Sequence, residues 1–203
     1  MTEPNSGAGT DVSELSPVPA PAAGPASTDP VRSSRFASLL LDSHRRLVGV
    51  GLCPPVWSSE AEAAAWLYED APFGLLVHDT SADPRFVYAN RTAQRCFGYS
   101  WEEFVGLPSR LSAGPGDQED RDAFLAAVDD RGYADGYRGL RLHKDGRNFW
   151  IEDVCMWNLV DADGERHGQA AVFGSWSPAS PASPAATDPD IGDAADAASG
   201  ART

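Results

Sequence analysis

The sequence predicts an α+β domain: a five-stranded antiparallel sheet with helices on one face, preceded by further helices. Two short apolar stretches, residues 74–80 and 85–90, come before a helical segment. Three longer extended stretches, residues 133–143, 149–160 and 167–176, follow it, and turns containing Asp and Gly separate them. This order of two strands, helices and three strands fits an antiparallel sheet with the helices packed on one side.

The most informative stretch is residues 86–107, where a strand runs directly into two short helices. Residues 86–88 are aromatic or β-branched, as strands favour. Asn90 stands where a helix N-cap is needed, and Gly98 stands where a C-cap needs a positive φ. The S-x-x-E spacing of residues 100–103 then predicts a capping box and a second helix.

Two helices are predicted ahead of the sheet. The Asp-Pro pair at 29–30 favours a helix start, and Gly49 and Gly51 end that helix. The S-x-x-E run at 59–62 opens a second, shorter helix that carries Trp66. These helices could pack on the outer sheet face or pair with a second subunit. We favour the chain's own sheet, because Trp66 and the neighbouring leucines need burial.

The predicted domain covers residues 30–177, with a helical extension over 30–70 and a core over 71–177. Residues 1–29 and 178–203 are expected to be disordered acidic tails. Ordering 30 residues costs about 45 kcal/mol, whereas burying the three sizeable aliphatic side chains of the first tail returns less than about 10 kcal/mol. A long helix is expected within the core at residues 117–130, with Phe124 on its apolar face.

Composition excludes several classes of function. The 203-residue chain has a net charge of -14 and no basic block, so nucleic-acid binding is not expected. It has no signal-peptide pattern and no apolar run of the roughly 18 residues that a membrane span needs. Cys53, Cys96 and Cys155 have no paired spacing, which favours reduced thiols and a cytoplasmic location.

The sequence does not predict an enzyme. The G-x-S-x-G motif is absent, and the cysteines and histidines lack metal-ligand spacing, so we predict no catalytic residue and no metal. Glu152 and Asp153 are adjacent on a strand, so their side chains point to opposite faces and are better suited to ion pairs with Arg138, Arg141 or Arg147. His78 and Asp79 fit either a pH-responsive pair or a hydrogen-bonded strand end.

What remains is a pocket between the sheet and the helices, since such pockets are mostly aromatic with a few polar anchors. The same side chains fit a solid core equally well. The candidate lining residues are Tyr88, Phe97, Tyr99, Phe104, Trp150 and Trp157, with Asn90, Arg138 and His143 as polar candidates.

Residues 33–177 resemble the PAS fold, and more closely the PAS-related MEKHLA family. The generic PAS features are Y-A-N, F-G-Y-S and K-D-G, whereas H-D-T-S-A-D-P-R-F-V-Y-A-N at 78–90, G-L-P-S-R at 106–110 and I-E-D-V-C-M-W-N-L at 151–159 are much more specific. The resemblance implies a sensory or regulatory module. It implies no particular ligand, so the cofactor is unknown.

The flavin-binding and haem-binding relatives supply two further comparisons. Flavin-binding light sensors of this superfamily carry a reactive Cys in an Asn-Cys-Arg run, but the equivalent G-L-P-S-R-L here has none. A cysteinyl–flavin adduct is therefore not expected, although a non-covalent flavin or another planar ligand stays open. Haem-binding relatives use a His on the helix that faces the sheet, and residues 117–130 contain no His.

We therefore expect a module that binds a small ligand or senses redox state and relays that signal to a partner protein by population shift. The alternative is a ligand-free interaction or homodimerisation module that uses the outer sheet face and the first helix. Because the sequence shows no output domain, the signal is expected to pass to a separate protein.

Overall fold

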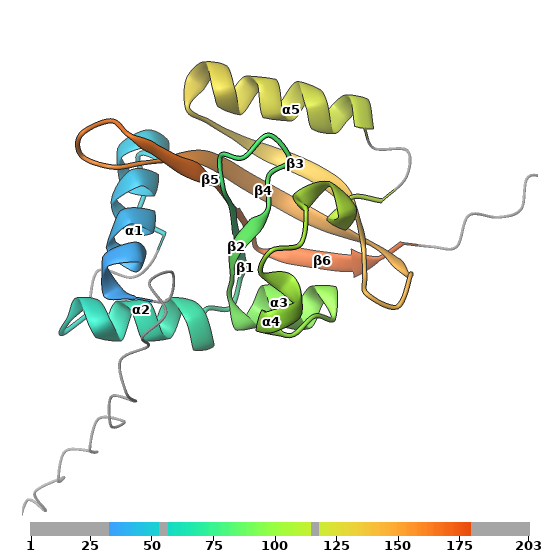
Figure 1. Ribbon diagram of the computed structural model, residues 1–203, viewed down its shortest axis with the longest axis horizontal. Helices are drawn as coiled ribbons and strands as arrows, with labels where there is room; N and C mark the ends of the chain where they lie inside the picture. Colours follow the sequence, from blue (N-terminus) through green and yellow to red (C-terminus); the bar gives the residue numbers. More distant parts are fainter. Residues whose placement is uncertain (1–32, 53–56, 115–117, 180–203) are drawn as a thin grey trace, which may run out of the picture.

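The computed structural model describes residues 33–52, 57–114 and 118–179 (Figure 1). The expected tail at 1–29 lies outside these residues, as does the tail expected at 178–203 except for residues 178 and 179, and Pro178 is the last residue of a strand. Two helices come first, then two strands, three short helical segments, a long helix and four strands. The elements are α1 (Ser34–Val48), α2 (Glu60–Glu69), β1 (Gly74–His78), β2 (Phe86–Ala89), α3 (Arg91–Phe97), α4 (Trp101–Phe104), η2 (Ser109–Ser112), α5 (Gln118–Arg131), β3 (Tyr133–Leu142), β4 (Asn148–Val160), β5 (Arg166–Phe173) and β6 (Ser175–Pro178).

The strands form one antiparallel sheet in the order β2-β1-β5-β4-β3, with β6 paired to β4. This confirms the α+β class and the predicted hairpin-like pairing of β1 with β2. The number of strands was wrong, since the sheet has six strands and not five. The expected last strand is divided at Gly174 into β5 and β6, because the chain bends there while both halves stay on the same edge of β4.

The division comes from a kink shared by two strands. The register between β4 and its neighbours β5 and β6 is the same on both sides of the kink, with Cys155 opposite Val172 on one side and Glu152 opposite Ser175 on the other. Asp153 of β4 lies between these pairs and has φ 53°. Because both strands bend at the same level, the ladder is preserved while the alternation of faces slips, as in a β-bulge.

The inner face of the sheet carries α3, α4, α5 and η2 (Figure 1). Phe97 of α3 is fully buried here and makes edge-to-face contacts with three other rings, at centroid distances of 5.4 Å to Phe104, 5.0 Å to Phe149 and 6.3 Å to Phe173. Aromatic pairs in this geometry add about 0.5–1.5 kcal/mol each beyond their burial. This aromatic cluster fixes the part of the inner layer that α3 and α4 form.

The outer face is covered by α1 and α2 of the same chain, as favoured from the sequence. Leu40 of α1 and Trp157 of β4 are fully buried in this second layer. The indole Nε1 of Trp157 donates a hydrogen bond to Ser43 Oγ at 3.0 Å, which ties the helix to the middle of the sheet. None of the helices in the described ranges is long and apolar enough to cross a lipid bilayer.

Local signals set most helix ends. Gly49 ends α1 with φ 84°, and the predicted capping box of α4 at residues 100–103 is present. The start of α1 was wrong: Ser33 accepts a hydrogen bond from Phe36 N, so the helix begins at Ser34, and the Asp-Pro pair at 29–30 lies outside the described residues. A Ser hydroxyl satisfies an orphan amide as well as Asp would.

Candidate functional site

A cavity of about 50 Å³ lies on the inner face of the sheet beneath α5 and η2. By volume it holds roughly three or four water molecules. Its wall draws residues from five strands and two helical segments. They are Leu76 and His78 of β1, Phe86 of β2, Ser109 and Ser112 of η2, Arg121, Phe124 and Leu125 of α5, Tyr137 and Arg141 of β3, Ile151, Val154 and Met156 of β4, and Gln169, Ala171 and Phe173 of β5.

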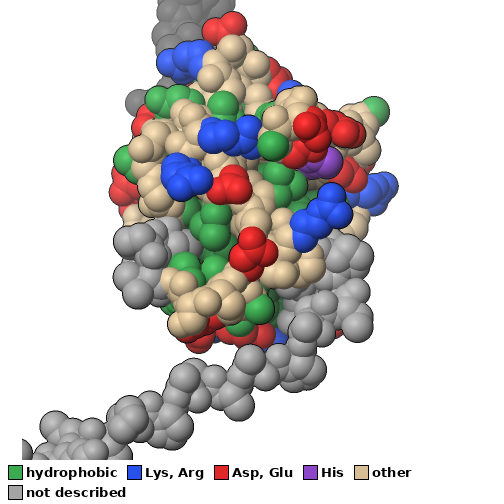
Figure 2. Space-filling view, turned by 90° about the vertical axis from the view of Figure 1, so that its left-hand side faces the viewer, with side chains coloured by type: hydrophobic (Ala, Val, Ile, Leu, Met, Phe, Trp, Pro, Cys, Tyr) green, Lys and Arg blue, Asp and Glu red, His purple; other side chains and the backbone are tan. Residues whose placement is uncertain are grey.

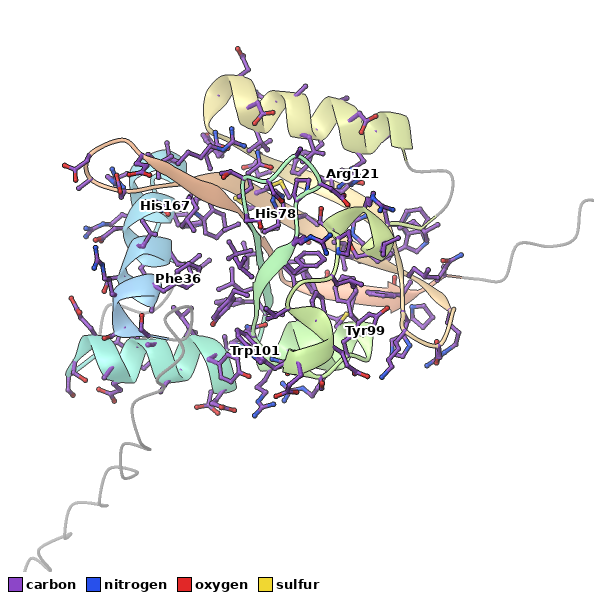
Figure 3. The ribbon with its side chains drawn as sticks, in the orientation of Figure 1. Phe36, His78, Tyr99, Trp101, Arg121 and His167 are labelled. Atoms are coloured by element: carbon purple, nitrogen blue, oxygen red, sulfur yellow. The ribbon has the colours of Figure 1, made fainter. Side chains whose placement is uncertain are left out.

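Arg121 brings a charge into this apolar layer. It lies on the same face of α5 as Phe124 and Val128, because residues three and seven apart line up on a helix. Its side chain is 20% exposed, and its nearest recorded ion-pair contact is Asp122 Oδ1 at 4.0 Å. Figure 3 labels Arg121 above the sheet, close to His78 on β1.

His78 faces the cavity from the end of β1. Its Nδ1 donates to the carbonyl oxygen of Asp79 at 3.0 Å, so in the neutral ring Nε2 carries the lone pair. Burial lowers the pKa of His78, the Asp79 carbonyl opposes this shift, and the positive charges of Arg121 and Arg166 add to it. The ring is therefore neutral near pH 7 and gains a proton readily only if a negative charge approaches.

The other walls are held firmly. Phe124 of α5 stacks on Tyr137 of β3, with centroids 4.5 Å apart and planes at 16°. Arg141 Nη1 donates to the Leu140 carbonyl at 2.9 Å, and its guanidinium lies 5.6 Å from the Tyr137 ring centre. The Phe124–Tyr137 stack fixes β3 against α5 on one side of the cavity, and the Arg141 contacts hold its side chain along β3.

A buried amide network closes the opposite side. Gln169 Nε2 of β5 donates to Asn158 Oδ1 of β4 and to Asp129 Oδ1 of α5, each at 3.1 Å. Asn158 Nδ2 in turn donates to the Val128 carbonyl at 3.2 Å. Because buried amides need partners, this chain of hydrogen bonds specifies how α5 sits on the sheet.

None of the nine pocket candidates named from the sequence lines this cavity. Phe97, Tyr99 and Phe104 belong to the neighbouring aromatic cluster of the inner layer. Tyr88 packs on the outer face among Phe36, Tyr68 and Trp101. The cavity lies farther along the sheet, under α5 and not under α3 and α4.

Asn90 is fully buried and has a structural role. Its Oδ1 accepts from the backbone N–H groups of Leu75 and Ala93, at 3.0 Å and 2.9 Å. Its Nδ2 donates to the carbonyls of Leu67 and Phe73, at 3.2 Å and 2.8 Å. All four hydrogen-bonding positions of the amide are thus used to join α2, β1 and α3.

Three other candidates lie on the outer face of the sheet. The guanidinium of Arg138 lies 3.8 Å from the ring centre of Trp150 and forms an ion pair with Glu152 at 3.1 Å. One of the partners expected for Glu152 is thereby confirmed. Trp157 is enclosed by α1, where the His44 ring packs against it edge-on at 4.7 Å.

Of the nine candidates, His143 lines a second and wider hollow of about 670 Å³ beside β6. Arg95, Arg147 and Trp176 also border it, and Trp176 is 44% exposed. His143 Nδ1 lies 2.8 Å from Asp145 Oδ1. Ser177, Pro178 and Ala179, at the end of the described residues, form the border of the hollow on the side of β6.

The described cysteines do not line the inner cavity. Burial raises the pKa of Cys96 to about 12 and that of Cys155 to about 11, with Asp135 adding to the latter. Both sulfurs are therefore held as unreactive thiols near neutral pH. These residues do not fit a cysteinyl–flavin adduct in the cavity, and Cys53 lies outside the described residues.

Asp161, Glu165 and His167 gather at the turn between β4 and β5 with their ligand atoms within 4.8 Å of one another. Hydrogen bonds account for this cluster: Asp161 Oδ1 accepts from the N–H groups of Asp163 and Glu165, and Asp161 Oδ2 lies 2.8 Å from His167 Nε2.

On the face drawn in Figure 2, acidic and basic side chains are interspersed, which is unlike a continuous basic patch.

The sequence held one signal for the missed cavity. Arg121 stands three residues before Phe124 on the apolar stripe of a predicted helix, where a charged side chain needs a partner. By contrast, nothing in the order of residues along β1, β3 and β5 shows that His78, Arg141 and Gln169 meet around it.

The MEKHLA domain family matches residues 34–178. A curated relative, the "Bacterioopsin transcriptional activator" of Halobacterium salinarum, is 31% identical over 109 residues. That match covers 52% of this chain and only 16% of the relative, so the chain spans a small part of that protein's length.

Two solved structures are similar to this chain. The PAS domain of a protein from Colwellia psychrerythraea has a TM-score of 0.47 and 25% identity, covering 53% of this chain and 89% of that one. An RNA-binding light-oxygen-voltage receptor has a TM-score of 0.49 and 24% identity, covering 60% of this chain and 36% of the receptor.

Proposed function

Because this chain belongs to the MEKHLA family, we propose that it is a sensory module whose inner-face cavity binds a small ligand and relays its presence to a partner protein. One observation carries the proposal. The cavity is lined by all five strands of the main sheet path and bordered by α5 and η2, so a ligand there lies where every strand on that path meets the helical layer.

Strand β4 offers a route from the cavity to the surface. Met156 lines the cavity, while the next residue, Trp157, points to the opposite face and bonds to Ser43 of α1. A ligand that binds one position of β4 better than another shifts the population of that position. Because α1 is attached to the same strand, a change in the position of β4 also changes the position of α1 on the outer face.

The kind of partner is a regulatory one. The curated relative is named a transcriptional activator, which supports a place in gene regulation for this chain too. The ligand-free alternative relied on the outer sheet face and the first helix as the interaction surface. In the structure α1 covers that face and buries Leu40 completely, so the ligand-binding proposal agrees better with the packing.

A matched pair of substitutions tests whether the cavity binds a ligand. Ala171→Leu extends a side chain into the cavity, whereas Ala126→Leu makes the same change on the exposed face of α5. The full chain is screened against a small-molecule library by thermal shift, with native mass spectrometry of the freshly purified protein. We expect a hit to raise the unfolding temperature of the wild type and of Ala126→Leu but not of Ala171→Leu.

Two results would contradict this proposal. One is a library in which no compound stabilises the wild type and no compound co-purifies with it. The other is a hit that stabilises Ala171→Leu as strongly as Ala126→Leu, since that compound binds elsewhere. Hydrogen exchange in α1 that changes on ligand addition would support the route through β4, because α1 does not touch the cavity.

A further inference from the structure

The charges around the inner cavity have one sign. The charged groups that line it are Arg121 of α5 and Arg141 of β3, no described Asp or Glu lines it, and His78 of β1 is a neutral ring there that can gain a proton. The other polar lining groups are uncharged, namely Ser109, Ser112, Tyr137 and Gln169. In a chain with a net charge of -14, this local excess of positive charge runs against the overall composition.

Arg121 is the group that most needs a counter-charge. Its side chain is largely buried, and Asp122, its recorded ion-pair contact, is 4.0 Å away and 62% exposed. An exposed carboxylate at that distance screens poorly, while a partly buried guanidinium has a substantial desolvation cost. A negative group inside the cavity would provide the two-point hydrogen bonding that guanidinium favours.

The size of the cavity limits what could supply that charge. About 50 Å³ accommodates an ion of roughly four to six non-hydrogen atoms. The Ser109 hydroxyl lines the cavity and can donate to an oxygen atom, whereas the Ser112 hydroxyl already donates to the Ser109 carbonyl at 2.7 Å. A small oxyanion meets both requirements.

We propose that the cavity is a binding site for a small oxyanion, a short carboxylate or inorganic phosphate, held chiefly by Arg121 with His78 as the second contact. This inference rests on the proposed function and names the class of ligand that the module senses. His78 Nε2 has no proton when the ring is neutral, because Nδ1 donates to the Asp79 carbonyl. Binding the anion therefore takes up a proton at Nε2, and binding tightens as the pH falls.

The groups around His78 support this direction. They are Arg121 from α5, Arg141 and Tyr137 from β3, Arg166 from β5, which is paired with Asp129, and Asp79, which follows β1 and whose charge favours the protonated ring. Arg121 and Arg166 disfavour the protonated ring in the empty site. An anion next to Arg121 cancels that effect, so the pKa of His78 rises on binding.

The test uses the full chain with acetate, oxalate and inorganic phosphate as probes at constant ionic strength, followed by thermal shift and titration calorimetry. Acetamide, an uncharged isostere of acetate, is the matched control. We expect a saturable rise in unfolding temperature with at least one oxyanion and none with acetamide. Comparison of phosphate with the carboxylates identifies which oxyanion the site prefers.

Variants locate the binding. Arg121→Gln should weaken the affinity for the oxyanion at least tenfold, and Arg45→Gln, the same charge change on exposed α1, should leave it unchanged. Arg121→Lys keeps the charge and should bind with intermediate affinity, which separates lost binding from misfolding. In the wild type the affinity for acetate or oxalate, which stay ionised over this range, should rise by up to about tenfold per pH unit on acidification from pH 7.5 to 6.0, and His78→Gln should remove that dependence.

Three results would overturn the oxyanion site. Equal stabilisation of the wild type and Arg121→Gln would show a non-specific salt effect. A pH-independent affinity would remove His78 from the site. Uncharged library compounds that are blocked by Ala171→Leu, with no response to any oxyanion, would reject the oxyanion while leaving the sensory proposal intact.

Discussion

Asn90 shows how one side chain joins three elements. The sequence identified it as the N-cap of α3, and its Oδ1 does accept from Ala93 N. The three further hydrogen bonds, to α2, to Phe73 and to β1, could not be predicted, because their partners lie 15–23 residues earlier in the chain. The sequence thus identified the N-cap role of Asn90 but not its hydrogen bonds to the other elements.

We expect Asn90→Ala to lower the free energy of unfolding by about 2–4 kcal/mol, since it removes the cap and leaves buried backbone groups without partners. Asn90→Asp keeps both acceptor contacts but faces the Leu67 and Phe73 carbonyls with oxygen, so it should also destabilise. Urea unfolding followed by circular dichroism measures both. An unchanged midpoint for Asn90→Ala would contradict the structural role.

At the scale of elements, the shared kink of β4 and β5–β6 allows one long strand to serve two hydrophobic layers. Beyond the kink, Val154 and Met156 face the cavity and Trp157 faces α1. The sequence predicted an uninterrupted strand, because the residues around Gly174 remain compatible with extended structure. The kink depends on the conformation of Asp153, for which a single sequence provides no strong signal.

Asp153 is exposed and has a positive φ, a conformation that glycine adopts without steric cost. Asp153→Gly should therefore be neutral or stabilise the domain by up to about 1 kcal/mol. Asp153→Val should destabilise it by about 1–2 kcal/mol, because a β-branched side chain clashes in this region. Thermal denaturation of the two variants under one buffer distinguishes them, and equal midpoints would show that the kink needs no positive φ.

Most of the element order could be predicted from local rules, since caps, turn residues and apolar alternation act over a few positions. The cavity could not be predicted in the same way. Its lining comes from seven elements. The aromatic residues chosen from the sequence lie instead in the two hydrophobic clusters or beside them, with Phe97 in one and Trp157 in the other. Aromatic content identifies a core, whereas the cavity lies where Arg121 and His78 interrupt it.

For the molecule as a whole, α1 and α2 form part of the hydrophobic core. Leu75 and Val77 of β1 and Trp157 of β4 are buried beneath them. The fold is thus three layers, with the sheet in the middle and helices on both sides (Figure 1). A sheet left bare on one side would expose an apolar surface of the kind that drives aggregation.

Removal of residues 1–70 should therefore give a protein that aggregates or binds a hydrophobic dye such as ANS, even though all six strands remain. Removal of residues 1–29 alone, which the sequence predicts to be disordered, should leave the unfolding midpoint unchanged. Size-exclusion chromatography and dye fluorescence compare the two. A monomeric, dye-free protein after the longer deletion would show that the outer layer is dispensable.

The hydrogen bond from Trp157 to Ser43 also gives the chain an intrinsic optical gauge. Indole emission depends on the polarity and hydrogen bonding around the ring, so a version that keeps Trp157 as its sole tryptophan would report in real time, without any attached label, whether the first helix lifts from the sheet.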